Sequence, residues 1–471
     1  MLAQKTTLHD ISNEKSLRFD VDYIKYQQAH ADGFYAFNEL FSIVSEGGYD
    51  DSVLTGEFKY CEIGDSDKNG DIVPVSLNFD LRNLEDESYY TKIEKGDITA
   101  VDLDDILIAK VRPNLKKYIR ITSDKQDVYY TTAFIRLKAK EMPELLYYCL
   151  RSIFYEDLMA ITRQGKGYPT INEKDLVSLK LNSSVIDKLR SNYPAITVLI
   201  KDVEEKILNM RSKTKSSQEI IDSVFQREFG FDYDKFEELK THRYYTTEKV
   251  FISNNPDLRF SAKFHRPAGD FVMEELTRIS DKKIKHFISE PIVLGASISP
   301  SDFDESGEAY YVSMATIKTL EVVLDETQLV SSSYFEAKKA KSLQRNDIVV
   351  ARSGVAIGKT AIVRDEFDGI FADFTMRIRF DEAKYNPQFA YYYLRSKYFQ
   401  YLIEVYKKGL QNQNIFPIVM QEFPIPDISL PEQQRIVDEI QAEIENQEQI
   451  KAEIASLRNQ IDEVIIQSIS A

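Results

Sequence analysis

The chain has 471 residues, of which 43% are hydrophobic, so it can bury packed cores, and its length alone predicts about three domains. The net charge of −16 at pH 7, taken as a sum, argues against nucleic acid as a partner. No apolar run reaches the ~18 residues of a membrane-spanning helix, and Met1 to Lys5 contain no apolar signal core.

The cysteine and histidine content argues against disulfides and metal sites. Cys61 and Cys149 are a lone pair in a long chain, so we expect a reducing, cytoplasmic compartment. The five histidines show no metal-ligand spacing with one another or with the cysteines, so we expect no structural zinc.

The first 137 residues predict a mixed helical segment followed by short strands. Helical spacing runs from Phe34 to Val44 and ends at Gly47-Gly48. From Phe58 to Leu137, apolar runs alternate with turns, and the clearest strands are Ile106–Val111 and Thr132–Leu137.

Helices are predicted to follow these strands. Pro143 precedes a helix from Glu144 to Arg163, and a glycine-rich loop follows it. After a short strand near Leu179–Leu181 and a connector from Asn182 to Ala195, a long helix is expected from Ile196 to Glu228. It carries apolar and small residues at heptad spacing, namely Val203, Ile207, Met210, Thr214, Ser217, Ile221 and Val224.

The second half repeats this order and ends in another long helix. Strands are expected around Tyr310–Ser313, Ile348–Ala351 and Thr375–Phe380, followed by a helix from Pro387 to Lys408. The last helix is predicted from Leu430, because Ser429 and Glu432 have the spacing of a capping box and Pro431 suits a first turn. Its apolar stripe is Ile436, Ile440, Ile450, Ile454, Leu457, Ile461 and Val464, which favours a coiled-coil partnership with the first long helix.

The order of elements reflects an internal repeat with a period of about 240 residues. Asp105–Lys110 matches Asp347–Arg352, and Tyr147–Ser152 matches Tyr391–Ser396. Further matches link Leu17–Phe19 with Leu258–Phe260, Gly165 and Ile171 with Gly409 and Ile415, and Ile221–Val224 with Ile461–Val464. Because these matches keep their order and spacing, the chain contains two copies of one unit.

Positive charge recurs at equivalent places in the two copies. Ile106 to Ser123 contain five basic residues and no acidic one, and Ile348 to Arg364 are also free of acidic residues. A second pair of basic stretches, 158–172 and 405–421, lies later in each copy. Any globular surface carries such runs, but their recurrence at equivalent positions favours two nucleic-acid-binding surfaces.

Sequence signals for catalysis are weak. Ser353 to Thr360 ends in Gly-Lys-Thr, but a phosphate-binding loop needs glycine where Ser353 stands and a helix after Lys359, whereas a strand is expected there. A carboxylate set of the nuclease type is matched only loosely by Asp257 and Asp281. No two prolines are adjacent, unlike the motif of amino-group methyltransferases, and no Ser/His/Asp set is evident.

These features resemble the specificity (S) subunit of type I restriction–modification enzymes. The resemblance is carried by Pro431–Val437, by both copies of the Asp105–Lys110 strand, by both Leu-Arg-Phe segments and by the duplicated order of domain and helix. The family's Pro-Glu-Gln-Gln signature is absent from the first copy, where Ser183–Asp187 stand.

The resemblance implies an α/β (α+β) fold with two target-recognition domains, each reading half of a split DNA site. It also implies that the two long helices form an antiparallel coiled coil and set the spacing between the half-sites. The predicted parts are 1–182 and 246–428 as recognition domains, 183–245 as the first helix with its linker, and 429–471 as the second helix. The chain itself would catalyse nothing and hold no cofactor. S-adenosylmethionine and ATP would belong to partners, namely two methyltransferase subunits and motor–nuclease subunits.

Residues in the four basic stretches are the expected DNA contacts, because basic side chains suit phosphates and guanine whereas amides suit adenine. In the first domain these are Lys110, Arg112, Asn114, Lys116, Lys117, Arg163, Lys166 and Tyr168. In the second they are Arg352, Ser353, Lys359, Thr360, Lys408, Gln411, Asn412 and Gln413. The alternatives are a duplicated coiled-coil scaffold that binds only proteins, an NTPase using Lys359, and the recognition subunit of a related phage-defence methylation system.

Overall fold

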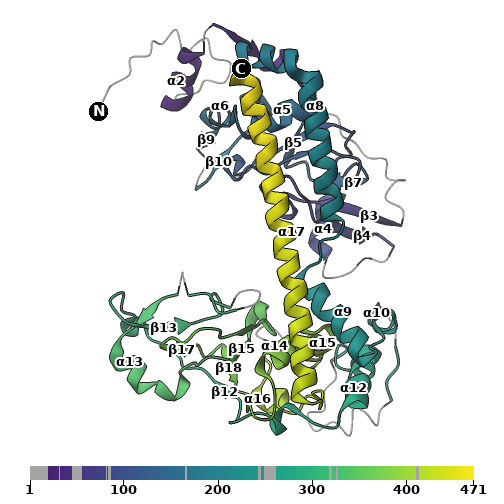
Figure 1. Ribbon diagram of the computed structural model, residues 1–471, viewed down its shortest axis with the longest axis vertical. Coiled ribbons are helices and arrows are strands. Elements are labelled where there is room, and N and C mark those ends of the chain that lie inside the picture. The colour runs from purple at the N-terminus through teal and green to yellow at the C-terminus, as the bar shows by residue number, and fades with distance from the viewer. Residues whose placement is uncertain are drawn as a thin grey trace. The chain divides into compact units, whose positions relative to one another are not determined.

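The computed structural model describes residues 20–30, 32–44, 56–80, 82, 86–164, 167–241, 245–248, 261–317, 321–324, 327–409 and 413–470. The chain divides into two compact units. Unit 1 comprises Met1–Ser212 with Glu453–Ala471, and unit 2 comprises Lys213–Ala452. Both units mix helix and sheet (Figure 1), which confirms the predicted fold class. The Leu-Arg-Phe segments and Gly47-Gly48 lie outside the described residues.

Unit 1 contains two main sheets. The four-stranded sheet has the order β2–β8–β5–β6, with every neighbour antiparallel. The three-stranded sheet has the order β4–β3–β7, in which β3 and β7 are parallel. The strands are β2 (Phe41–Ile43), β3 (Glu57–Cys61), β4 (Val75–Asn78), β5 (Asp105–Ala109), β6 (Tyr118–Arg120), β7 (Val128–Tyr130) and β8 (Phe134–Ala139).

Unit 2 repeats both sheets, which confirms the repeat. Its four-stranded sheet has the order β12–β18–β15–β16, and its three-stranded sheet has the order β14–β13–β17 with β13 and β17 parallel. The strands are β12 (Val293–Leu294), β13 (Ala309–Val312), β14 (Leu329–Val330), β15 (Ile348–Ala351), β16 (Thr360–Ile362), β17 (Gly369–Phe371) and β18 (Thr375–Ile378). The register agrees too, since Ile106 faces Leu137 and Ile348 faces Ile378.

The central strand of each four-stranded sheet is buried on both faces. In β15, Val349 and Ala351 pack with the three-stranded sheet, whereas Ile348 and Val350 pack with the helices on the other face. Unit 2 therefore has three layers, and continuous apolar strands such as β5 and β15 are what a strand covered on both sides requires. The helices of this layer are α14 (Pro387–Arg395) and α15 (Lys397–Tyr406).

Each of the two helices predicted after the strands is interrupted at a serine. Instead of Glu144–Arg163, unit 1 has α5 (Pro143–Arg151) and α6 (Tyr155–Ala160), with Ser152 between them. In unit 2, Ser396 separates α14 from α15. There, Asp222 accepts a hydrogen bond from the backbone N–H of Lys397 at 2.7 Å, which compensates for the interrupted helix. Periodicity cannot show such caps, because they come from distant residues.

The predicted helix from Phe34 to Val44 is wrong. This segment forms β1 (Phe34–Ala36), the short α3 (Phe37–Leu40) and β2. β1 pairs with β11 (Lys180–Asn182) and β2 pairs with β8, so strand partners far along the chain override the local helical spacing.

Remaining short elements complete the units. In unit 1 they are α2 (Val21–Ala29), α4 (Glu87–Glu94), β9 (Arg163–Gln164), β10 (Pro169–Thr170) and α7 (Glu173–Leu176). In unit 2 they are α10 (Tyr233–Thr241), α12 (Pro267–Ile279), α13 (Ser332–Ala337) and α16 (Pro417–Met420).

The final helix, α17, runs from Leu430 to Ser470 as predicted, and the N–H of Glu432 donates to the Ser429 hydroxyl at 3.4 Å. Its stripe residues Ile436, Ile440, Ile454 and Ile461 are buried. Toward its end, Ile465 is buried rather than the predicted Val464, which is half-buried.

The first long helix is two helices, α8 (Ser183–Arg211) and α9 (Ser217–Phe229), instead of one helix from Ile196 to Glu228. The predicted connector 182–195 is the start of α8, with Asn182 as its N-cap. The interruption is capped by the buried Gln447, whose Oε1 accepts a hydrogen bond from the N–H of Lys215 at 2.8 Å. Ser216 then caps α9 with Glu219 in a capping box.

Within each unit, α17 pairs antiparallel with one of these helices (Figure 1). In unit 1, Lys188 and Asn192 of α8 donate to the carbonyl oxygens of Ile469 and Ser468. In unit 2, Arg227 of α9 forms an ion pair with Glu439 at 2.6 Å. None of the described helices is both long enough and apolar enough to cross a membrane.

Candidate nucleic-acid interface

In unit 1, the two basic stretches singled out in the sequence lie side by side. The backbone N–H of Arg112 donates to the carbonyl oxygen of Pro169 at 2.9 Å, and the N–H of Ile171 donates to that of Lys110 at 2.9 Å. The loop after β5 and the segment around β10 therefore form one surface, although about 60 residues separate them in sequence.

Unit 2 builds the same frame at equivalent positions. The N–H of Ile415 donates to the carbonyl oxygen of Arg352 at 2.9 Å, and Ser353 forms a bridge with Asn414. Lys408 and Asn414 also exchange backbone hydrogen bonds, at 2.8 and 2.7 Å. Each unit thus brings its two basic stretches together by an equivalent hydrogen bond, from Ile171 in unit 1 and from Ile415 in unit 2, and by an equivalent β-bridge.

The loop after the central strand has the same unusual backbone in both units. In unit 1, Arg112 and Lys116 have positive φ angles of 53° and 55° and flank a short 3-10 helix. In unit 2, the equivalent residues are Gly354 and Gly358, with φ angles of 77° and 86°. The glycines that made this stretch look like a phosphate-binding loop thus serve left-handed turns, and strand β16 follows them instead of a helix.

Unit 1 keeps two long basic side chains where glycine would be relaxed. A left-handed conformation costs a non-glycine residue about 1–2 kcal/mol. Backbone strain of this kind gathers at functional sites, where the side chain gives a benefit that outweighs the cost. The strain therefore supports a function for the Arg112 loop.

The most accessible candidates of unit 1 lie on this loop. Tyr168 is 41% exposed, and the Arg112 guanidinium lies 5.1 Å from the centre of its ring. Asn114 is exposed on the short 3-10 helix between the two left-handed residues. Together these three side chains offer a cation, an aromatic face and an amide to a ligand.

Four other basic candidates of unit 1 already have partners in the protein. Lys110 pairs with Glu173 at 2.8 Å, and Arg163 pairs with the buried Asp175 at 2.8 Å. The ammonium groups of Lys116 and Lys117 donate to carbonyl oxygens, those of Arg151 and Ile63 respectively. These four side chains bind other groups of the protein. The sequence alone does not show whether a basic side chain has such a partner or contacts a ligand.

In unit 2, Lys359 is the exposed cation of the loop, and Arg352 donates from Nε to the carbonyl oxygen of Asp373 at 2.9 Å. Ser353 and Thr360 are buried, with 8% and 4% of their surface exposed. Lys408 and Gln413 are half-buried. The predicted contacts Lys166, Gln411 and Asn412 lie outside the described residues.

Sequence reasoning missed exposed apolar side chains beside these loops. Phe374 is 57% exposed, Phe416 is 40% exposed and Ile418 is 70% exposed. All three lie on segments that contact or follow the frame around Arg352. A comparison of the two copies could have indicated two of them, because the aligned residues of unit 1 are Ala133 and Asn172.

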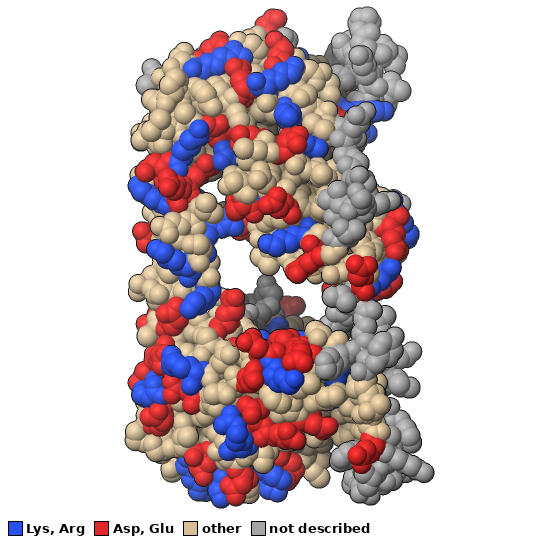
Figure 2. Space-filling view, turned by 90° about the vertical axis from the view of Figure 1, so that its right-hand side faces the viewer, with Lys and Arg blue, Asp and Glu red and all other residues tan. Residues whose placement is uncertain are grey.

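One face of the molecule carries both signs of charge. On the face drawn in Figure 2, Lys and Arg are interspersed with Asp and Glu, and neither sign forms one broad area outside the grey atoms. On this face, a DNA-binding surface would therefore be confined to local features.

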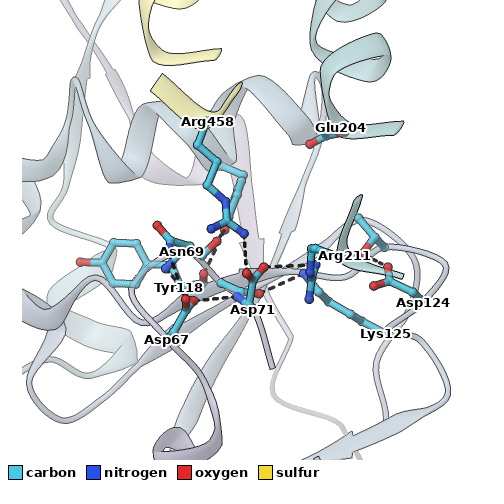
Figure 3. A network of polar contacts seen from close by, with 12 residues as sticks. Asp67, Asn69, Asp71, Tyr118, Asp124, Lys125, Glu204, Arg211 and Arg458 are labelled. Carbon is cyan, nitrogen blue, oxygen red and sulfur yellow. Dashed lines mark hydrogen bonds and ion pairs between the residues drawn. The ribbon is translucent and has the colours of Figure 1, made fainter. Parts of the chain in front are cut away.

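A second polar region of unit 1 lines a cavity of about 580 Å³ beside α8 and the end of α17. Asp71 lies between Arg211 and Arg458 and pairs with both, as Figure 3 shows. Arg120 pairs with Glu204 of α8 at 2.7 Å. Because these cations are matched by acids, the region is best explained as the attachment of the sheets to the helices.

Lys125 is the most deeply buried cation of this region. Its ammonium donates to the carbonyl oxygen of Gly70 at 2.9 Å, and burial, aided by the nearby Arg211, lowers its pKa to about 8. Between pH 8 and the ordinary lysine pKa near 10.5, the unfolded chain binds more protons at this residue than the folded chain does. The free energy of unfolding should therefore rise with pH in this window.

We expect the Lys125→Met variant to lack this pH dependence. The stability of the wild type relative to the variant should increase by on the order of 3 kcal/mol from pH 7.5 to pH 10. Denaturant unfolding of the full chain at both pH values measures it. Lys206→Met is the control, because Lys206 is exposed. If the stability difference between wild type and Lys125→Met changes with pH as little as that of the control, the assignment is contradicted.

Part of the sequence matches a known protein family. Residues 291–456 match the family model described as the type I restriction modification DNA specificity domain. This part of the chain is similar to that DNA specificity domain. The match confirms the resemblance seen in the sequence, and the specificity domain so defined contains all four strands of the larger sheet of unit 2 with the loop around Arg352.

Solved structures with low sequence identity are also similar to the chain. The HsdS subunit from Thermoanaerobacter tengcongensis is 15% identical with a TM-score of 0.34, covering 93% of this chain and 97% of that one. The type I restriction–modification S subunit from M. genitalium is 12% identical with a TM-score of 0.38, covering 93% and 95%. A chain from a study of assembly and conformational transition of the type I R-M system is 15% identical with a TM-score of 0.47, covering 93% and 97%. No curated protein sequence matches the chain.

Proposed function

We propose that this chain is the DNA specificity subunit of a type I restriction–modification complex, in which unit 1 reads one half of a bipartite DNA site and unit 2 reads the other. The observation that carries the proposal is the duplicated loop frame. Both units join two basic stretches by an equivalent hydrogen bond, from Ile171 to Lys110 and from Ile415 to Arg352, and both have left-handed residues at the same two positions of the loop. Residues 291–452 of unit 2 lie within the matched specificity domain, and unit 1 has the same strand order.

The units carry different side chains on this shared frame, which suits the reading of two different half-sites. Arg112 and Lys116 of unit 1 stand where unit 2 has Gly354 and Gly358. The cations of unit 1 can contact phosphates or guanine. The glycines of unit 2 have no side chain, so in that unit the neighbouring side chains would contact the bases.

Catalysis belongs to other subunits in this proposal. Two methyltransferase subunits would supply S-adenosylmethionine chemistry, and motor–nuclease subunits would use ATP. The chain itself holds no cofactor in this assignment. A cytoplasmic location fits Cys61 and Cys149, which are buried and form no disulfide.

The purified chain should therefore methylate no DNA by itself. Adding the methyltransferase subunit of the proposed complex, with S-adenosylmethionine, should produce methylation at one split sequence. Transfer of labelled methyl groups to plasmid DNA, followed by sequencing of the modified sites, measures both results. Methylation by the chain alone would contradict the assignment, and sequence-independent DNA binding by the complex would leave it without a reading function.

The Arg112→Gly variant separates recognition from stability. Glycine relieves the left-handed strain, which stabilises the folded chain. This gain is offset by the greater conformational entropy of glycine in the unfolded chain and by the lost contact with Tyr168. The free energy of unfolding should therefore stay within ~1 kcal/mol of wild type. DNA affinity of the assembled complex should fall. The slope of log affinity against log salt should decrease by about one if Arg112 contacts a phosphate.

Arg112→Ala is the matched control, because it removes the same side chain but keeps the strain. Both variants should lose the same DNA affinity, whereas Arg112→Ala should be less stable than Arg112→Gly. Unchanged binding in both variants would remove Arg112 from the interface.

A further inference from the structure

Phe374 occupies an exposed position that its residue type does not favour. Its side chain is 57% exposed, although phenylalanine is among the residues most often buried. The phenylalanines of the adjoining strand and helices, Phe371, Phe389 and Phe399, are all buried. A single exposed apolar residue is ordinary, so the position of Phe374 decides its meaning.

That position is directly across from Arg352 at the end of the central sheet. Ala351 faces Thr375 in the antiparallel pair of β15 and β18, and the next pair outward is Arg352 with Phe374. The N–H of Arg352 donates to the carbonyl oxygen of Phe374 at 2.9 Å. The backbones of the two residues are therefore adjacent, and the Arg352 Nε donates to the carbonyl oxygen of Asp373, the residue before Phe374, at 2.9 Å.

A second exposed phenylalanine lies on the other side of Arg352. Ile415 donates from its N–H to the carbonyl oxygen of Arg352 at 2.9 Å, and Phe416, 40% exposed, follows it. Adjacent extended segments are about 4.8 Å apart, so these backbones span about 10 Å, less than the ~12 Å width of a major groove. The frame is therefore narrow enough to approach base edges.

Unit 1 has the same cross-strand pair without an aromatic ring. Ala109 faces Phe134 in the pair of β5 and β8, so the next pair outward is Lys110 with Ala133. The N–H of Lys110 donates to the carbonyl oxygen of Ala133 at 3.0 Å. The two units thus share the backbone and differ in the side chain, as expected for a residue that determines which half-site is read.

We propose that Phe374 is a specificity-determining residue that contacts the 5-methyl group of a thymine in the half-site read by unit 2. The proposal rests on the proposed function and names a base feature within it. In the major groove, the thymine methyl is the apolar feature that distinguishes A·T pairs, and apolar side chains are its usual partners. Arg352 and Lys359, which lie on the loop after β15, supply positive charge that suits DNA phosphates or guanine.

The test uses the assembled complex of the full chain with its methyltransferase subunit. Once the methylated site is known, each thymine of both half-sites is replaced singly by deoxyuridine, which removes only the methyl group. At one thymine of the second half-site, wild-type affinity should fall about fourfold, the value of one buried methyl group. No replacement in the first half-site should depend on Phe374.

The Phe374→Ala variant should bind the thymine and deoxyuridine duplexes equally well, and Phe374→Leu should keep part of the difference. Val73→Ala removes another exposed apolar side chain, 79% exposed, and should leave the difference intact. Ala133→Phe should change preference in the first half-site alone. Far-UV circular dichroism and melting of each variant verify folding.

The outcomes separate the inference from the function on which it rests. A wild-type complex that binds no specific sequence would overturn the proposed function. Specific binding with no effect of any deoxyuridine in the second half-site, or a deoxyuridine effect that persists in Phe374→Ala, would overturn the role of Phe374 alone.

Discussion

Replacing Asp347 by alanine should lower the free energy of unfolding of unit 2 by about 3–5 kcal/mol. The Asp347 carboxylate is fully buried at the start of the central strand. Its two oxygens accept hydrogen bonds from Nε and Nη2 of Arg379, both at 2.7 Å. The N–H of Gln344 donates to the same group at 2.8 Å. The substitution leaves the arginine charge largely buried without this partner, which is the costly half of breaking a buried pair.

Denaturant unfolding of the full chain, followed by circular dichroism, measures this loss. Asp281→Ala is the matched control, because Asp281 is 88% exposed and its pair with Lys282 is long at 3.9 Å, so its loss should be under about 0.5 kcal/mol. In unit 1, Asp105→Ala should have a similar cost, because Arg136 keeps a second partner in Asp102 just as Arg379 keeps one in Glu290. Equal effects of Asp347→Ala and the exposed control would refute the account of the sheet.

Lengthening the helices that link the two units should lengthen the gap between half-sites. We expect four residues inserted after Ala452 of α17, matched by four after Thr214 between α8 and α9, to add ~6 Å. That length corresponds to about two base pairs at ~3.4 Å each. Two base pairs also turn the DNA by on the order of 70°, so affinity should fall. The identity of each half-site should survive, because neither loop frame changes.

Sequencing of the sites methylated by such a variant gives the gap directly. Four residues inserted after Ser306, in an exposed turn of unit 2, are the control and should leave the gap unchanged. A wild-type gap in the helix variant would show that these helices do not set the spacing. Altered half-sites would show that the units do not read independently.

The repeat and the central strands were predictable because their information is local. Apolar runs such as Asp105–Ala109 and Ile348–Ala351 identify buried strands wherever they occur, and their matched order revealed the duplication. The interruptions of the helices were not predictable. They depend on partners such as Asp222 and Gln447, which are far from the interruptions in sequence and meet them only in the folded chain.

The candidate site was predictable in location but not in detail. Clustered charge identified both basic stretches, since charge is visible in composition. Which lysines project outward is a tertiary property, and Lys116 and Lys117 donate to backbone carbonyl oxygens instead. The role of Phe374 depends on its exposure and on its pairing with Arg352, neither of which a single sequence shows.

The central claim, that each unit reads one half of a split DNA site, is tested most directly by a hybrid chain. Residues 267–428 of unit 2 are replaced by the equivalent segment of a specificity subunit that methylates a different site, and methylated DNA is sequenced from cells that also express the methyltransferase subunit. We expect the hybrid to keep the wild-type gap and one wild-type half-site while the other half-site becomes that of the donor. A hybrid that methylates the complete wild-type site, or one in which both half-sites change, would contradict the claim.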